Sequence, residues 1–103
     1  MEFIVQIINQ VAELNQKLIQ EELGPKFERN LNRLFSIFEE QGYICSIPLG
    51  EKYNDARTDC TANVVGNEGK NMIITQVIKP IVYHKSNGTI TLLQKGIVMV
   101  ENI

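Results

Sequence analysis

Few side chains in this 103-residue chain have the chemistry of a catalytic or metal-binding group. His84 is the only histidine, and the two cysteines, Cys45 and Cys60, do not have C-x-x-C spacing. A zinc site would therefore need carboxylates to complete its ligand set. We expect His84 to be a solvated loop side chain and both cysteines to be reduced, partly buried thiols.

Carboxylates gather in the polar segment EKYNDARTD, which contains Glu51, Asp55 and Asp59. Paired carboxylates serve in acid–base catalysis or hold a divalent cation, but this spacing fits no calcium loop. The nearby segment GNEGKN lacks the spacing of a phosphate-binding loop and precedes an expected strand instead of a helix. The sequence therefore predicts a solvated acidic loop, no cofactor, no metal and a protein that is not an enzyme.

The composition is that of an ordinary globular protein, with 44% hydrophobic and 21% charged residues. The net charge of −2 gives no field that would hold a polyanion, so no nucleic-acid partner is expected. The apolar runs are far shorter than the roughly 20 residues of a membrane helix. The start, MEFIVQIINQ, lacks the basic region of a signal peptide. We therefore expect a cytoplasmic protein with no membrane partner.

The N-terminal part has the apolar periodicity of two helices. Residues 1–23 carry an a/d heptad seam and form a helix, which Gly24-Pro25 ends, with Gly24 suited to the left-handed position after a helix. The chain there makes either a kink or a full reversal, and residues 26–40 form a second amphipathic helix that ends at Gly42. The seam is only two to three heptads long, and its partner is either the second helix of the same chain or a second copy. We favour a homodimer, through Ile4, Ile7, Val11, Leu14 and Leu18.

After Gly42 the pattern changes to short strands. Asn87-Gly88 is the strongest hairpin signal, and Thr89–Val100 is the expected return arm, bulged at Gly96. Helices followed by a run of strands predict an α+β fold, with a helical dimerisation region at 1–41 and a small antiparallel β-domain at 42–103. The expected strands are Tyr43–Ile47, Thr61–Val65, Met72–Ile78, Ile81–Tyr83, Thr89–Leu93 and Ile97–Val100.

Several stretches resemble the GrpE family of nucleotide exchange factors for DnaK-type chaperones. They are LFSIFEEQGY, PLGEKYNDARTDCTANVV, NMIITQVIKPIVY and LLQKGIVMVE. The last is similar to the closing strand of the family, with Gln94 where the family has an arginine. The order of parts is also similar, since in that family a long dimerising helix and shorter helices precede a small terminal β-domain.

The resemblance implies a dimeric, non-catalytic cochaperone. In that family the β-domain of one subunit binds the ATPase domain of the chaperone and favours an open cleft, so that ADP leaves. The residues that this role would assign to partner binding are Asn87, Gly88, Gln94 and Val100. Val100 is equally well explained as a core residue, and Asn87-Gly88 by turn chemistry alone. The alternative function is a dimeric protein-interaction module without exchange activity.

Overall fold

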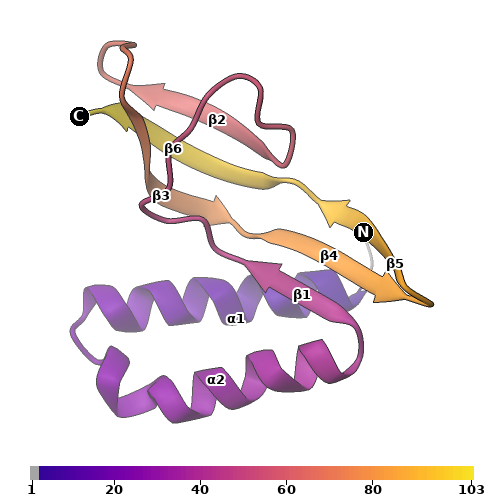
Figure 1. Ribbon diagram of the computed structural model, residues 1–103. Coiled ribbons are helices and arrows are strands. Elements are labelled where there is room, and N and C mark those ends of the chain that lie inside the picture. Colours follow the sequence, from indigo (N-terminus) through magenta and orange to yellow (C-terminus); the bar gives the residue numbers. More distant parts are fainter. Residues whose placement is uncertain (1–2) are drawn as a thin grey trace.

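The computed structural model describes residues 3–103 and has two helices followed by six strands, which confirms the predicted α+β class (Figure 1). The two helices run antiparallel beside one face of the β region, so the chain reverses fully between them. The helices are α1 (Phe3–Gln20) and α2 (Gly24–Glu40). The strands are β1 (Tyr43–Ser46), β2 (Cys60–Val65), β3 (Met72–Lys79), β4 (Ile81–Ser86), β5 (Thr89–Gln94) and β6 (Gly96–Asn102).

The reversal between the helices differs from the prediction in one residue. Glu22, and not Gly24, takes the left-handed conformation, with a φ of 61°. The Leu23 amide donates to the Leu18 carbonyl at 2.8 Å and the Glu22 amide to that of Ile19 at 3.0 Å, which is the Schellman pattern. Gly24 instead begins α2, followed by Pro25 in the first turn. The left-handed position is therefore occupied by a residue with a Cβ, which costs free energy.

Residues 72–102 form one long hairpin. Its turn, Asn87-Gly88, has φ values of 52° and 78°, as a type I′ turn requires, and it pairs Ser86 with Thr89. The outgoing arm is interrupted at Pro80, between β3 and β4, and the return arm at Lys95, between β5 and β6. The predicted return arm is present, but it is divided into two strands at Lys95, and its register shift lies opposite Val82 and Tyr83 and not at Gly96.

The interruptions divide the hairpin between two three-stranded sheets, with the orders β1-β4-β5 and β2-β6-β3. All neighbouring strands are antiparallel except β2 and β6, which run parallel from Cys60 opposite Gly96 to Val65 opposite Glu101. We had predicted an antiparallel β region, and the structure departs from this in one pair of strands, β2 and β6. β6 pairs with β3 on one side. β2, which comes earlier in the chain, pairs with the other side of β6 and runs in the same direction as β6.

Two apolar clusters stabilise this arrangement. One lies within the β region, where Val98 and Val100 are fully buried, and the other joins Val5 and Ile8 of α1 to Phe38 of α2 and Val82 of β4. The helices therefore share a core with the β1-β4-β5 sheet. The first cluster consists of Cys60, Ile74, Val77, Ile81, Val98 and Val100.

The left-handed conformation of Glu22 yields a stability prediction. We expect Glu22→Gly to raise the free energy of unfolding by about 1 kcal/mol, because glycine adopts a positive φ without steric cost. Glu21→Gly is the matched control, since Glu21 has no positive φ and should lose up to about 1 kcal/mol. Urea unfolding measures both variants. Equal shifts for the two would contradict the assignment of the strain to Glu22.

Candidate interaction surfaces

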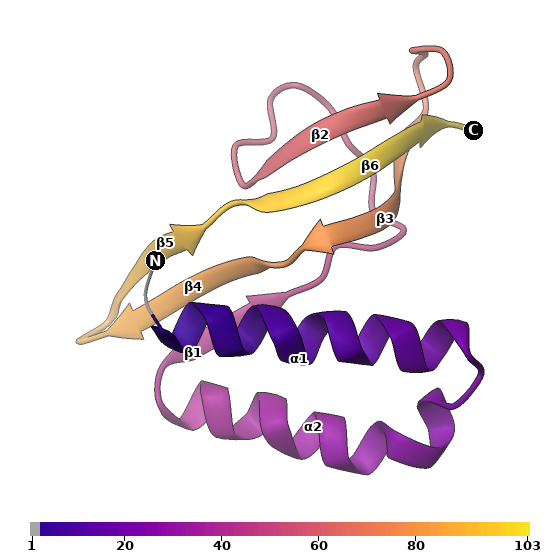
Figure 2. The ribbon, with the colours of Figure 1, turned by 180° about the vertical axis from the view of Figure 1, so that it is seen from behind.

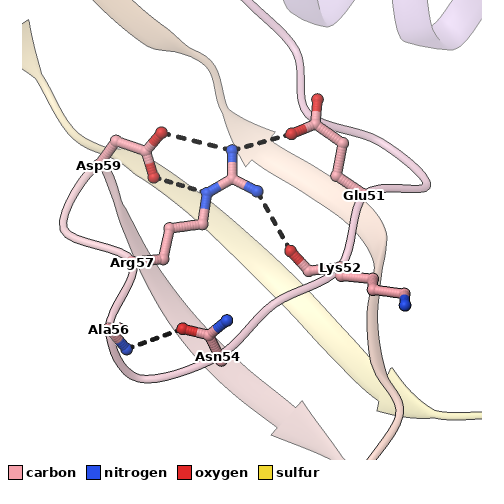
Figure 3. Close-up of polar contacts among 6 residues, drawn as sticks. All are labelled: Glu51, Lys52, Asn54, Ala56, Arg57 and Asp59. Atoms are coloured by element: carbon pink, nitrogen blue, oxygen red, sulfur yellow. Dashed lines mark hydrogen bonds and ion pairs between the residues drawn. The ribbon is translucent and has the colours of Figure 1, made fainter.

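The acidic loop is organised by Arg57 (Figure 3). Its Nε donates to Oδ1 of Asp59 at 2.6 Å and its Nη2 to Oδ2 of the same carboxylate at 3.3 Å. Nη2 also lies 3.0 Å from Oε1 of Glu51, and Nη1 donates to the Lys52 carbonyl at 3.3 Å. The Arg57 side chain is only 18% exposed. Two of the three predicted carboxylates thus share one cation, while Asp55 remains exposed in the loop.

This cluster consists of contacts within the loop, and it leaves few reactive side chains nearby. The hydrogen bond from Arg57 lowers the pKa of Asp59, so this carboxylate is a weak base. The neighbouring Cys60 thiol is buried, and burial together with the negative charge of Asp59 raises its pKa to about 11. Burial also raises the pKa of Cys45 to about 11. Both thiols are therefore protonated at neutral pH, which makes them poor nucleophiles.

The histidine lies in a strand and not in a solvated loop. His84 belongs to β4, is half-buried, and stacks on Tyr43 of β1 with ring centroids 4.5 Å apart. Within residues 3–103, no three His, Cys, Asp or Glu side chains are grouped so that they could hold a metal ion. In the same part of the chain, neither helix is long and apolar enough to span a membrane.

The residues predicted to bind a partner occupy three different environments. Asn87 and Gly88 are exposed at the tip of the long hairpin, which projects beyond the helices (Figures 1 and 2). Gln94 is engaged inside the molecule: its Nε2 donates to Oδ1 of Asn9 at 2.7 Å and to the Pro80 carbonyl at 2.9 Å. Val100 is fully buried, in agreement with its interpretation as a core residue. The structure therefore leaves the tip accessible and uses the other two side chains internally.

The predicted dimerisation seam lies beside the buried face of α1. The buried residues are Val5, Ile8 and Ala12, whereas Ile7 and Leu14 are 39% and 50% exposed. The other seam residues, Ile4, Val11 and Leu18, are half-buried. Phe3, Ile7, Val11 and Leu14 line one shallow apolar groove with Gln6 and Gln10. We call this groove the α1 groove.

The second helix also carries exposed apolar side chains. Leu34 and Ile37 are exposed, and Ile37 lies on the same side of α2 as Arg33 and Glu40, at helical spacings of four and three residues. Arg33 and Glu40 form an exposed ion pair at 3.5 Å. The helical hairpin thus presents the α1 groove and an apolar position on α2 that is flanked by opposite charges.

Three structural features were not found from the sequence: the Arg57 cluster, the Asn9–Gln94 amide pair and the exposure of Thr89–Leu92 in β5. The first has a local signal, because Arg57 is surrounded in sequence by three carboxylates. The second joins residues 85 positions apart, and no local pattern indicates it. No family model, curated protein or solved structure matches the chain, so the comparisons assign it to no family.

The Arg57–Asp59 pair yields a pH prediction. The folded pKa of Asp59 lies below its unfolded value of about 3.9, so the pair stabilises the protein above that pH, and the stabilisation is lost as the pH falls through the folded pKa. We expect Asp59→Asn to be less stable than wild type by about 1–2 kcal/mol at pH 7. This gap should close on acidification.

Urea unfolding between pH 7 and about pH 2 measures the gap. Asp55→Asn is the matched control, because Asp55 is an exposed carboxylate of the same loop that has no ion pair among residues 3–103, and it should follow wild type throughout. A gap for Asp59→Asn that stays constant with pH would show that its side chain stabilises the fold by packing and not by charge.

Proposed function

We propose that the protein is a non-catalytic, dimeric protein-interaction module whose helical hairpins form the dimer interface. The observation that carries the proposal is the α1 groove, where Phe3, Ile7 and Leu14 remain exposed although α1 is packed against α2 and the sheet. Such a stripe on an otherwise packed helix is typical of an interaction site. Its helical spacing fits a partner helix.

Charge favours a second copy of this chain as that partner. α1 carries one acidic and one basic residue, and α2 carries three of each, so neither helix has a net charge that would repel its own copy. In a two-fold dimer with antiparallel α2 helices, Arg33 of each copy faces Glu40 of the other across the two Ile37 side chains. The intrachain ion pair can thus be exchanged for two pairs across the interface.

The dimer is tested by burying a charge in the proposed interface. We expect Leu14→Glu and Ile37→Glu each to convert the protein from dimer to monomer in sedimentation equilibrium, because a carboxylate in an apolar interface loses its hydration without gaining a partner. Gln20→Glu adds the same charge to α1 outside the groove and should remain dimeric.

A charge exchange makes the test specific for a self-complementary interface. Arg33→Glu brings carboxylates together across the two-fold axis and should weaken the dimer, whereas combining it with Glu40→Arg should restore the dimer. A wild-type protein that is monomeric at every concentration tested would refute the dimer.

The nucleotide-exchange role is a second candidate, favoured by the order of parts and by the accessible hairpin tip. Helices precede the β region, as the resemblance to the exchange factors implies, and Asn87 and Gly88 are exposed at the hairpin tip. In this role the tip would bind the open state of a DnaK-type ATPase domain more tightly than the closed state, which shifts the population toward release of ADP. Gln94 and Val100 would support the hairpin. The role requires a cytoplasmic location, which stays a prediction.

An ADP-release assay tests this candidate. We expect the wild-type protein to accelerate release of a fluorescent ADP analogue from a DnaK-type chaperone, and nucleotide to weaken the complex by the same linkage. Asn87→Asp is the conservative variant of the tip, since aspartate tolerates the turn conformation but adds a negative charge. No acceleration at saturating protein would eliminate the exchange role and leave the dimeric module standing.

A further inference from the structure

Among the described residues 3–103, none covers the outer edge of strand β5, and both of its faces are exposed near the hairpin tip. Thr89, Ile90, Thr91 and Leu92 are all exposed, with Ile90 at 60% and Leu92 at 39%. β5 is the outermost strand of the β1-β4-β5 sheet. The outer edge of β3, in contrast, is covered by the segment 50–53. There the Gly50 amide donates to the Ile74 carbonyl at 2.8 Å and the Ile74 amide to the Glu51 carbonyl at 2.9 Å.

The register shows which backbone groups the open edge presents. A two-residue turn makes its flanking residues, Ser86 and Thr89, a hydrogen-bonded pair, and such pairs alternate along an antiparallel ladder. Thr91, opposite His84, therefore bonds to β4, whereas Ile90 and Leu92 direct their amides and carbonyls outward. No other segment within residues 3–103 forms a backbone hydrogen bond with these two residues.

The same two residues supply side-chain contacts for an added strand. Leu92 is opposite Tyr83, which in turn is opposite Ile44, so these three side chains form a row across one face of the sheet. Ile90 lies on that face, two residues further toward the tip. An extended segment added beside β5 would continue the row with apolar side chains at alternate positions.

The charge next to the edge indicates the chemistry of the segment. Lys95 directly follows β5, is exposed, and has no ion-pair partner among the described residues. Lys85, opposite Ile90, shares a surface hollow with Glu39 and Glu40, which reduces its positive field. A second copy of β5 would bring no carboxylate to Lys95, because SNGTITLLQK contains no acidic residue. We propose that β5 binds an extended segment of another protein by strand addition. This segment carries alternating apolar residues and an acidic side chain at its end.

The probes are two fluorescein-labelled peptides, EVTVTVE and KVTVTVK, measured by fluorescence anisotropy with the full-length protein. We expect the acidic peptide to bind about tenfold more tightly than the basic one, and Lys95→Glu to reverse this preference. In hydrogen exchange followed by NMR, the bound acidic peptide should slow the exchange of the Ile90 and Leu92 amides but leave that of Thr91 unchanged.

Two variants distinguish strand addition from other binding modes. Ile90→Pro removes an outward amide without removing a hydrogen bond to β4, and should weaken the acidic peptide about tenfold. Thr91→Val is the side-chain control and should bind normally, because the Thr91 side chain lies on the opposite face of β5 from Ile90 and Leu92. Leu14→Glu should also bind normally, which separates this edge from the helical interface.

Three outcomes would overturn the proposal. The first is that the acidic peptide does not bind. The second is that both peptides bind equally tightly and that Lys95→Glu does not change their affinity. This test does not require that the Ile90→Pro variant folds. The third is self-association that Ile90→Pro abolishes, without peptide binding, which would assign the edge to a second copy of the chain.

Discussion

The interruption of the long hairpin at Pro80 and Lys95, just before Gly96, is the constraint on which the rest of the structure depends. Proline has no amide to continue the ladder of the outgoing arm. On the return arm, a Cβ at Gly96 would lie 2.9 Å from Cγ1 of Ile81 and 3.3 Å from Sγ of Cys60, so only glycine allows this close approach. The Gln94 side chain joins the two arms at the interruption by donating a hydrogen bond to the Pro80 carbonyl. The two ends of the hairpin can therefore belong to different sheets, one beside the helices and one with its own core.

Gln94, at the same interruption, also sets the orientation of α1 about its own axis. Asn9 and Gln94 exchange amide hydrogen bonds at 2.7 and 3.0 Å, which ties one side of the helix to the interrupted arm. With Asn9 held there, Val5 and Ile8 reach the cluster around Val82, and successive residues turn by 100° per position. Ile7 and Leu14 then lie on another side of the helix. The exposed groove thus results from the orientation that the amide pair and the core impose on α1.

The parts of the fold with a local signal were predictable from the sequence. Helical periodicity located α1 and α2, and Asn87-Gly88 located the hairpin turn, because only residues that tolerate positive φ fit both positions of a type I′ turn. The parallel pairing of β2 with β6 was not predictable, since the pattern of a strand does not name its neighbour. The same limit applies to Gln94, whose partners lie 85 and 14 residues away. The left-handed Glu22 was missed because glycine, two residues later, was the obvious residue for that conformation.

The open edge of β5 is best understood beside the outer edge of β3, which the chain covers. An uncharged strand with exposed isoleucine and leucine is the kind of edge that proteins normally protect with charge, proline or a covering segment, and the chain does cover β3 with residues 50–53. The edge of β5 is instead limited by an irregularity in its pairing with β4. The register shift between Val82 and Tyr83 places the unpaired Leu93 just before Gln94, so the regular ladder beside β4 ends after Leu92. In the regular part of the ladder, Ile90 and Leu92 present outward backbone groups, which is enough for a short added segment.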